Sequence, residues 1–332
     1  MSPRILVTGA AGQIGSELVV ALRKRYGESN VVATDKAVTR AQVVPDVLEQ
    51  LDVMHLSSVE RALRTHRVDT VYHLAAILSA VGEANPDLAW DINMGGLKNI
   101  LDASVRHGVQ RVFWPSSIGV FGPDAPKVGA PQETPLNPTT MYGVTKVAGE
   151  LLAEYYFLKH GLDVRSVRYP GLISSEAKPG GGTTDYAVEI FYSAIQSGRY
   201  ACFLSEDTIL PMMYMPDALR AAIEIMEADP RKVKIHRGYN VAAVSFSAGD
   251  LAAEIAKHVA GFAVTYSPDS RQVIADSWPR SIDDSPARHD WGWKEKYDMP
   301  TMVTEMLARL RRRLSAGEKT FNSTAGSIHR YR

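Results

Sequence analysis

The stretch ILVTGAAGQIGSELVVALRKRYG (residues 5–27) decides the fold. An apolar run typical of a β-strand leads into a turn that contains Gly9, Gly12 and Gly15. Behind the turn, apolar residues recur along one face of a predicted helix: Ile14, Leu18, Leu22 and Tyr26. Glycines at such a turn let the backbone approach a pyrophosphate, which the helix N-terminus then stabilises. The stretch therefore predicts a strand–turn–helix unit that binds a dinucleotide.

The same alternation continues through the first half of the chain. Further strands are predicted at 30–35, 69–76, 109–117 and 162–169, and helices at 57–67, 95–108 and 141–161. Strands that alternate with helices form a parallel sheet with right-handed crossovers and helices on both faces. The fold class expected is α/β, a Rossmann-type doubly wound parallel sheet, with a smaller C-terminal substrate-binding lobe.

The second half is less regular. Helices are predicted at 185–196, 251–261 and 301–314, after a glycine-rich loop at 179–184. No low-complexity linker separates the two halves, so the lobe is expected to lie against the sheet. We predict a cofactor-binding domain over 1–175, a lobe over 176–316 with some return to the sheet, and a poorly ordered tail over 317–332.

The composition excludes several classes of function. With 37 basic and 37 acidic residues among 332, the chain offers no electrostatic reason to bind nucleic acid or an anionic membrane. It has no run of 18 or more apolar residues, so no membrane span is predicted. Cys202 is the one cysteine, which excludes an internal disulfide and a cysteine-rich zinc site; it is expected to be buried, and no metal is expected.

Asp35 indicates which dinucleotide is bound. It ends the second predicted strand, twenty residues beyond Gly15, where a carboxylate accepts hydrogen bonds from the ribose 2′-hydroxyl. It would repel a 2′-phosphate by about 4 kcal/mol at 4 Å and an effective dielectric of 20. Lys36 follows Asp35 and leaves some attraction for a phosphate, but the balance favours NAD over NADP.

Two Tyr-x-x-x-Lys pairs occur on one predicted helix: Tyr142 with Lys146, and Tyr155 with Lys159. Residues four apart share a helix face, so each lysine could stabilise a phenolate. Ligands bind at the carboxyl edge of such a sheet, where this helix begins. Tyr142 lies in the first turn and Tyr155 about 20 Å further along the axis, so Tyr142 is the candidate base.

The preceding strand ends at this edge with Ser116 and Ser117, hydroxyls able to bond a substrate oxygen. The aromatic run of Tyr155, Tyr156 and Phe157 is expected to pack in the core or against a partner chain. A free tyrosine titrates near pH 10, so its phenolate needs roughly 4 kcal/mol of stabilisation to act near neutrality.

Taken together, TGAAGQIG, HLAA, INMGGLKNIL, SSIGVFG and YGVTK resemble the landmarks of the short-chain dehydrogenase/reductase superfamily, in its extended branch. The resemblance implies that Ser117, Tyr142 and Lys146 are catalytic, that His73 lines the cofactor without acid–base work, and that a homodimer forms through the helix over 139–160 and its predecessor. The implied NAD contacts are Gly9, Gly12, Gln13, Ile14, Gly15, Asp35, Asp52, Val53, Leu74, Ala75, Ala76, Asn93, Tyr142, Lys146 and Tyr169.

Other segments narrow the resemblance. LSAVGEANP, RYPGLIS, PGGGTTDYA, LPMMYMPD and DSWP are similar to the short-chain type of L-threonine 3-dehydrogenases. That likeness implies oxidation of L-threonine by NAD to 2-amino-3-oxobutanoate. It also favours the mitochondrial matrix as the compartment and leaves the cytoplasm open. The implied substrate contacts are Ser79, Ser117, Tyr142, Thr183, Thr184 and Trp278.

Each of these assignments has an alternative. Ser79 could satisfy backbone at a strand end, Thr183 could cap the helix that follows, and Trp278 could be packing only. A nucleotide-sugar epimerase or dehydratase shares the fold and the three catalytic residues. A non-catalytic NAD-sensing protein would share the fold alone.

Overall fold

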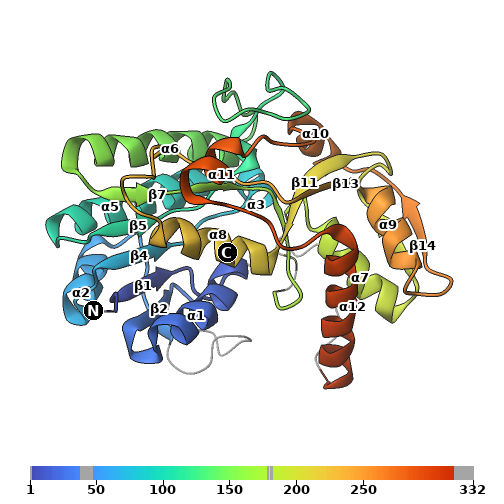
Figure 1. Ribbon diagram of the computed structural model, residues 1–332, viewed down its shortest axis with the longest axis horizontal. Helices are drawn as coiled ribbons and strands as arrows, with labels where there is room; N and C mark the ends of the chain where they lie inside the picture. The colour runs from blue at the N-terminus through green and yellow to red at the C-terminus, as the bar shows by residue number, and fades with distance from the viewer. Residues whose placement is uncertain (1, 38–47, 178, 180–181, 318–332) are drawn as a thin grey trace.

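The computed structural model describes residues 2–37, 48–177, 179 and 182–317 (Figure 1). The segment expected to be a tail, 317–332, lies outside the described residues from position 318 on, as do positions 180–181 of the glycine-rich loop. Among the described residues, no helix is both long and apolar enough to cross a bilayer.

A parallel six-stranded sheet organises the N-terminal part, as the alternating pattern predicts. Every neighbouring pair in it is parallel, and its order is β3-β2-β1-β4-β5-β7. The strands are β1 (Ile5–Thr8), β2 (Val31–Asp35), β3 (Leu48–Gln50), β4 (Thr70–His73), β5 (Arg111–Phe113) and β7 (Asp163–Arg165).

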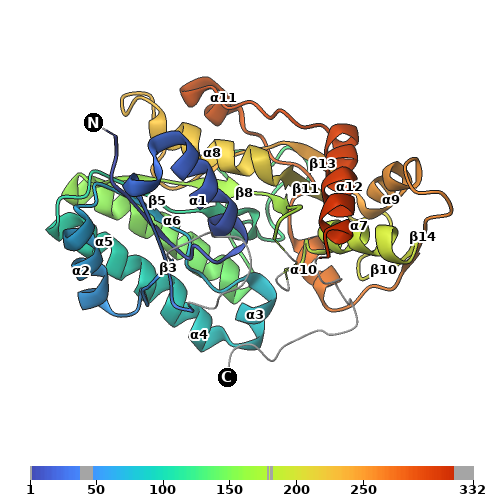
Figure 2. The same cartoon turned by 90° about the horizontal axis from the view of Figure 1, so that it is seen from below.

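Helices cover both faces of this sheet (Figure 2). On one face, α1 (Gln13–Tyr26) and α8 (Met215–Glu227) pack through Leu18 and Ala221 onto Ile5 and Val7 of β1. On the other, α2 (Leu56–His66), α5 (Gly96–Arg106) and α6 (Met141–His160) share a second core with Leu6. Alternate residues of one strand thus enter opposite cores, as strand geometry requires.

Two predicted strands each divide between two sheets. The run at 162–169 forms β7 and then β8 (Val167–Tyr169), and the run at 109–117 forms β5 and then β6 (Ser116–Ser117). β8 lies between β6 and β12 (Tyr239–Asn240) in a small second sheet. This division carries Ser116 and Ser117 out of the large sheet, toward the start of α6.

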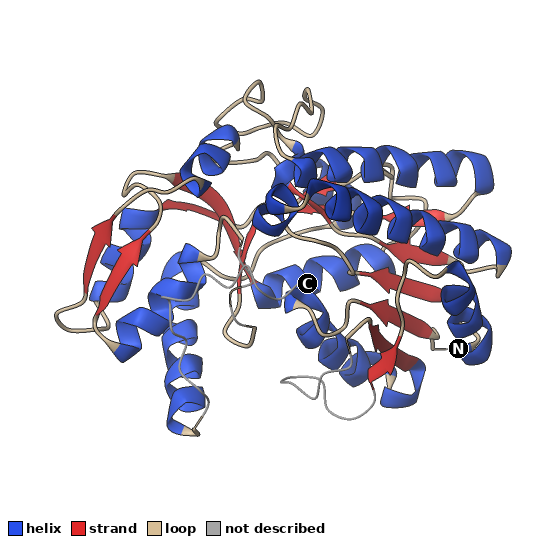
Figure 3. Ribbon diagram, turned by 180° about the vertical axis from the view of Figure 1, so that it is seen from behind, coloured by secondary structure: helices blue, strands red, loops and turns tan. Residues whose placement is uncertain are grey.

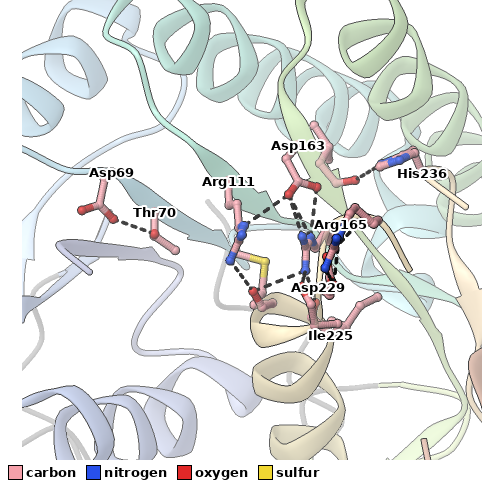
Figure 4. Close-up of polar contacts among 12 residues, drawn as sticks. Asp69, Thr70, Arg111, Asp163, Arg165, Ile225, Asp229 and His236 are labelled. Atoms are coloured by element: carbon pink, nitrogen blue, oxygen red, sulfur yellow. Dashed lines mark hydrogen bonds and ion pairs between the residues drawn. The ribbon is translucent and has the colours of Figure 1, made fainter. Parts of the chain in front are cut away.

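A buried arginine anchors α8 beside this division (Figure 4). Arg165 pairs with Asp163 at 2.7 Å and donates to the carbonyls of Ile225 and Ala228, at the end of α8. A cation suits that end of the helix dipole. Although α8 and β12 lie beyond residue 176, both pack with the first part of the chain. The domain boundary near 175 stays a prediction.

The remaining elements form a lobe beside the sheet (Figure 3). Its core unites Phe191, Leu210, Leu251 and Leu307, and Cys202 is buried there, as expected. The lobe contains β9 (Gly171–Ile173), β11 (Ile209–Tyr214) and β13 (Val244–Ser247) in one sheet, β10 (Arg199–Cys202) with β14 (Ala263–Tyr266) in another, and α7 (Tyr186–Gln196), α9 (Ala248–Ala256), α10 (Arg271–Ser277) and α12 (Met299–Ser315). The short helices α3 (Ser79–Ala84) and α4 (Pro86–Trp90) lie beside α6, and α11 (Ser285–Trp291) lies beside β12.

Close packing of α6 on the sheet part gives a stability prediction. A Cβ atom on Gly149 would lie 2.4 Å from the ring of Trp114, which is buried. Overpacking costs about 1–3 kcal/mol, more than the helix propensity of about 1 kcal/mol that alanine gains. We expect Gly149→Ala to lower the free energy of unfolding by about 1–2 kcal/mol in urea melts.

Gly82→Ala is the matched control, because its added Cβ meets neighbours only at 3.4 Å or more. It should leave the free energy of unfolding unchanged or slightly higher. Equal stability of the two variants would contradict tight packing at Gly149.

Candidate active site

The turn between β1 and α1 approaches its neighbours too closely for side chains. Gly9 has φ +70°, and a Cβ there would lie 2.6 Å from the backbone nitrogen of Ala75. A Cβ on Gly15 would lie 2.1 Å from the Gly9 carbonyl oxygen. At Gly12, the N-cap of α1, an added Cβ would meet only that same oxygen, at 3.2 Å.

The helix therefore begins at a residue with no side chain to cap it, and its N–H groups remain able to bind an anion. Beside it, the Gln13 amide nitrogen is buried with no hydrogen-bond partner in the described part of the chain. A buried donor left unsatisfied costs about 1–3 kcal/mol, so a polar ligand at this turn would stabilise it. These features fit the pyrophosphate of a dinucleotide.

Asp35 lies at the end of β2, beside this turn. Its carboxylate accepts hydrogen bonds from the backbone N–H groups of Ala11 at 3.0 Å and Ala37 at 3.2 Å. The Lys36 ammonium lies 3.2 Å from Asp52, so this cation already has an anion of the chain itself. The attraction for a 2′-phosphate that Lys36 could supply is thereby reduced, which favours NAD.

Two predicted cofactor residues have side chains bound within the protein. Asn93, in a π-helical turn over Asp91–Gly95, bonds the N–H of Ile77 at 2.8 Å, its carbonyl at 3.2 Å and the Thr145 hydroxyl at 3.1 Å. It thereby holds the segment after β4 against α6. The Tyr169 hydroxyl donates to the Ala218 carbonyl at 2.6 Å inside the core, so this side chain serves packing.

Ser117, Tyr142 and Lys146 come together at the carboxyl edge of the strands. Thr140 caps α6 by accepting from the Gly143 N–H at 3.1 Å, which places Tyr142 in the first turn. A Cβ on Gly119 would lie 3.0 Å from the Tyr142 ring and 3.5 Å from the Ser117 Oγ, so these two side chains lie close together. The Lys146 ammonium donates to the Pro115 carbonyl at 2.6 Å and lies 5.5 Å from the centre of the Tyr142 ring.

Burial shapes the charges of this group. Burial lowers the pKa of Lys146 to about 7, while the nearby Glu150 carboxylate acts in the opposite direction. Burial also raises the pKa of Tyr142, and the nearby Ser117 hydroxyl lowers it by a smaller amount. A positive charge beside Tyr142 is therefore needed to form the phenolate near neutral pH, and an oxidised nicotinamide carries one.

His73 is neutral in this site. Burial lowers its pKa to about 3, with the positive charge of Lys146 adding to the effect. Its Nδ1 lies 2.7 Å from the Thr8 hydroxyl, on the neighbouring strand. The imidazole is thus unsuited to proton transfer near neutrality, as the resemblance implies.

The second Tyr-x-x-x-Lys pair lies away from the site. Tyr155 is half exposed on the surface of α6, whereas Tyr156 is buried and its hydroxyl bonds Asp102. Phe157 stacks on His236 with ring centres 3.4 Å apart. The three residues point in different directions, because successive helical residues lie about 100° apart, and Tyr156 packs in the core, as expected.

The predicted substrate residues lie on different elements. Ser79 begins α3 and is buried, and Glu83 of the same helix accepts a hydrogen bond from the Met141 N–H at the start of α6. A Cβ on Gly171 would lie 2.7 Å from the Thr184 methyl group. Trp278 is buried in the core of the lobe, so packing is at least part of its role.

The Thr183 hydroxyl is buried and has no hydrogen-bond partner among the described residues. Capping of the following helix is therefore not its role: α7 begins at Tyr186, and the Asp185 carboxylate accepts from the Gly182 N–H at 2.8 Å instead. An unpaired buried hydroxyl is available to a polar ligand.

Sequence reasoning missed several residues that support this site. Glu83 contacts a residue 58 positions away, and the Lys127 ammonium donates to the Asp276 carbonyl at 2.7 Å, 149 positions away. Neither carries a local signal in the sequence. Glu150 does carry one, because it continues the four-residue spacing from Tyr142 through Lys146.

The chain is similar to known proteins over most of its length. Residues 5–242 match the model of the NAD dependent epimerase/dehydratase family, which is more than half of the chain. The chain belongs to this family. Its glycine-rich turn, Asp35 and the group around Tyr142 all lie within the matched residues.

Within the NAD dependent epimerase/dehydratase family, several relatives are similar over nearly the whole chain. The mitochondrial L-threonine 3-dehydrogenase of Sus scrofa is 48% identical over 92% of this chain and 82% of its own. A GalE-like L-threonine dehydrogenase from Cupriavidus necator, in holo form, is 51% identical with a TM-score of 0.90, over 93% and 100% of the two chains. A monomeric L-threonine 3-dehydrogenase from a metagenome, in apo form, is 50% identical with a TM-score of 0.89, over 93% and 99%.

Asp35 should decide cofactor choice. Its replacement by serine removes the carboxylate that accepts from a ribose 2′-hydroxyl and repels a 2′-phosphate. We expect Asp35→Ser to weaken NAD binding about tenfold or more and to bring the dissociation constants of NAD and NADP closer together, because charged hydrogen bonds contribute about 1.5–3 kcal/mol. Isothermal titration with each cofactor measures both constants.

Glu60→Gln, at a partly buried carboxylate of α2 that pairs with Arg106 of α5, is the control and should change neither constant. An unaltered ratio of NAD to NADP affinity in Asp35→Ser would contradict the assignment.

Proposed function

We propose that this protein is an NAD-dependent L-threonine 3-dehydrogenase that converts L-threonine to 2-amino-3-oxobutanoate. The observation that carries the proposal is the grouping of Ser117, Tyr142 and the buried Lys146 at the carboxyl edge of the strands. The identities of 48% and 51% to threonine dehydrogenases support the choice of substrate.

Each residue of the group has a distinct role in the proposed reaction. Tyr142, as phenolate, accepts the proton of the threonine hydroxyl at its Oη. Ser117 donates a hydrogen bond to the same substrate oxygen as that oxygen becomes a carbonyl. Lys146 stabilises the phenolate by its charge and is held for this by the Pro115 carbonyl. Bound NAD supplies the acceptor for the hydride that leaves the β-carbon.

The residues proposed to bind NAD are those named from the sequence, with the backbone of the turn at Gly9–Gly15 on the pyrophosphate. Asn93 and Tyr169 would act on it through the segments that they hold. Ser79, Thr183, Thr184 and Trp278 are proposed to hold or enclose threonine. The unpaired Thr183 hydroxyl supports this, because a polar group of the substrate would complete its hydrogen bonding.

Replacing Tyr142 by phenylalanine tests the base. General base catalysis contributes about 10²–10⁴-fold, so we expect Tyr142→Phe to lower kcat for threonine oxidation at least about a hundredfold while NAD binding is retained. Absorbance of NADH measures turnover, and titration of protein fluorescence measures NAD binding.

Tyr155→Phe is the matched control, since it alters the other Tyr-x-x-x-Lys pair on the same helix. It should keep full activity. Retained turnover in Tyr142→Phe would exclude this tyrosine as the base.

The epimerase or dehydratase alternative makes a different prediction for the wild-type protein. That chemistry returns the hydride to the substrate, so NADH would not accumulate. NADH formed with L-threonine and not with UDP-glucose would establish the dehydrogenase. Tightly retained NAD with no NADH from either would favour the alternative, and NAD binding with no turnover of any β-hydroxy amino acid would favour a sensing protein.

The surface of α6 supports a homodimer, which we include in the proposal. Val144, Leu151, Tyr155 and Leu158 lie along one face of the helix with exposed fractions of 40–70%. Val105 on the neighbouring α5 is exposed as well. A second copy packed on this face would bury these side chains, at a gain of about 25 cal/mol per Å² of apolar surface.

Charges on this face should abolish association. We expect Leu151→Lys combined with Tyr155→Lys to give a folded monomer in light scattering, because burying two unpaired ammonium groups is costly. Val20→Lys, at an exposed apolar position on α1, is the control and should remain dimeric. A wild-type protein that is monomeric at all concentrations, like the metagenomic relative, would refute the dimer.

The compartment is also part of the proposal. We propose an intracellular enzyme, with the mitochondrial matrix favoured by the name of the Sus scrofa relative and the cytoplasm as the alternative. Cell fractionation followed by an antibody distinguishes the two.

A further inference from the structure

A buried polar network lies directly behind the proposed catalytic group. Glu150 on α6 and Arg168 on β8 are 1% and 3% exposed and form a bidentate pair, with both nitrogen–oxygen distances at 2.8 Å. Arg168 also donates to the Gln132 carbonyl at 3.0 Å and to the Asn240 side chain at 3.2 Å. All charges of the pair are therefore matched within the chain.

Such a pair is a poor way to stabilise a core. Removing two ions from water costs several kcal/mol each, and apolar side chains of similar volume often stabilise a protein as well or better. The position of this pair suggests another purpose. Glu150 lies one helical turn beyond Lys146 and two turns beyond Tyr142, on the same face of α6.

Glu150 also contacts the strand that carries the proposed catalytic serine. The Ser116 hydroxyl donates to its carboxylate at 2.6 Å. Ser116 stands between Pro115, whose carbonyl binds the Lys146 ammonium, and Ser117, which lies beside Tyr142. One carboxylate thus holds the three-residue segment 115–117 against the helix that carries the other two catalytic residues.

We propose that Glu150 and Ser116 are positioning residues for the reaction: their hydrogen bond fixes segment 115–117 on α6, so that Ser117 and the Pro115 carbonyl hold Tyr142 and Lys146 in their reactive arrangement. This rests on the proposed dehydrogenase function. The carboxylate has a second effect, because its charge opposes the lowering of the Lys146 pKa by burial.

The effect of Glu150 on the Lys146 pKa depends on the other charged and titratable groups that face Lys146. Tyr142 and Glu150 face it from α6 itself, His73 acts on it from β4, and Arg168 of β8 is paired with Glu150. His73 is neutral near pH 7, since its pKa is about 3. Glu150 is therefore the anion that keeps Lys146 protonated.

Ser116→Ala is the first test, because it removes the contact and leaves the ion pair intact. A displacement of catalytic groups by a fraction of an ångström to 1 Å costs up to about a hundredfold in rate. We expect kcat for threonine to fall about tenfold, with the KM for NAD within about twofold and little change in melting temperature.

Gln132→Leu is the matched control. It removes buried hydrogen bonds to Gly238 and Asn240 in the same network but touches no atom of segment 115–117. We expect it to lower the melting temperature and preserve kcat. A kcat that follows stability in both variants, or stays unchanged in Ser116→Ala, would overturn the inference and leave Glu150 a structural residue.

Glu150→Gln tests the charge. Without the carboxylate, the Lys146 pKa falls below its wild-type value of about 7, so Lys146 becomes neutral and the phenolate loses its cation at a lower pH than in wild type. The ratio of wild-type to variant kcat should therefore grow between pH 6 and pH 8, whereas a merely structural defect gives a constant ratio.

A second readout does not depend on turnover. In protein labelled with 13Cε-lysine, the Lys146 resonance, assigned by its loss in Lys146→Arg, should titrate at lower pH in Glu150→Gln than in wild type. An unshifted titration overturns the inference whether or not threonine is oxidised. Absent NADH in wild type together with a shifted Lys146 titration overturns the proposed substrate and retains Glu150 as the positioning residue.

Discussion

The hydrogen bond from the Lys146 ammonium to the Pro115 carbonyl is the contact on which the candidate site depends. It joins α6, which carries Tyr142, to the segment that leads from β5 into β6, which carries Ser117. The ammonium also lies 4.5 Å from the ring of Trp114, which packs against Gly149 of the same helix. A buried cation is costly alone, and here a carbonyl, an aromatic face and a carboxylate one turn away offset that cost.

Close packing of backbone atoms also shapes the glycine-rich turn of the proposed cofactor site. Gly9 and Gly15 are required because backbone atoms occupy the volume that side chains would fill, whereas Gly12 leaves the helix N-terminus uncovered. Asn93 then holds the segment after β4 to α6, which links the floor of the dinucleotide site to the helix of the proposed base. Cofactor and catalytic group are therefore positioned by one connected set of contacts.

Contacts between residues far apart in the sequence explain why residue type alone does not reveal the role of some side chains. Tyr169 and Trp278 fit a ligand-contact pattern, yet their side chains are buried in the cores of the sheet part and the lobe. Thr183, which could have been a helix cap, instead has a buried hydroxyl with no hydrogen-bond partner among the described residues. Burial and pairing distinguish these cases, and neither property is written in the local sequence.

The sequence by itself determined the parallel sheet, the dinucleotide turn, the likeness to NAD-dependent dehydrogenases and the choice of Tyr142 over Tyr155, because strand–helix periodicity and residue spacing are local. The tertiary structure decided the division of residues 109–117 and 162–169 between two sheets, the separate surroundings of Tyr155, Tyr156 and Phe157, and the network of Glu150, Arg168 and Ser116. Those features depend on contacts between residues far apart in the sequence, such as Arg168 and Asn240, which are 72 positions apart. Such contacts form only when the chain folds, so spacing along the chain cannot predict them.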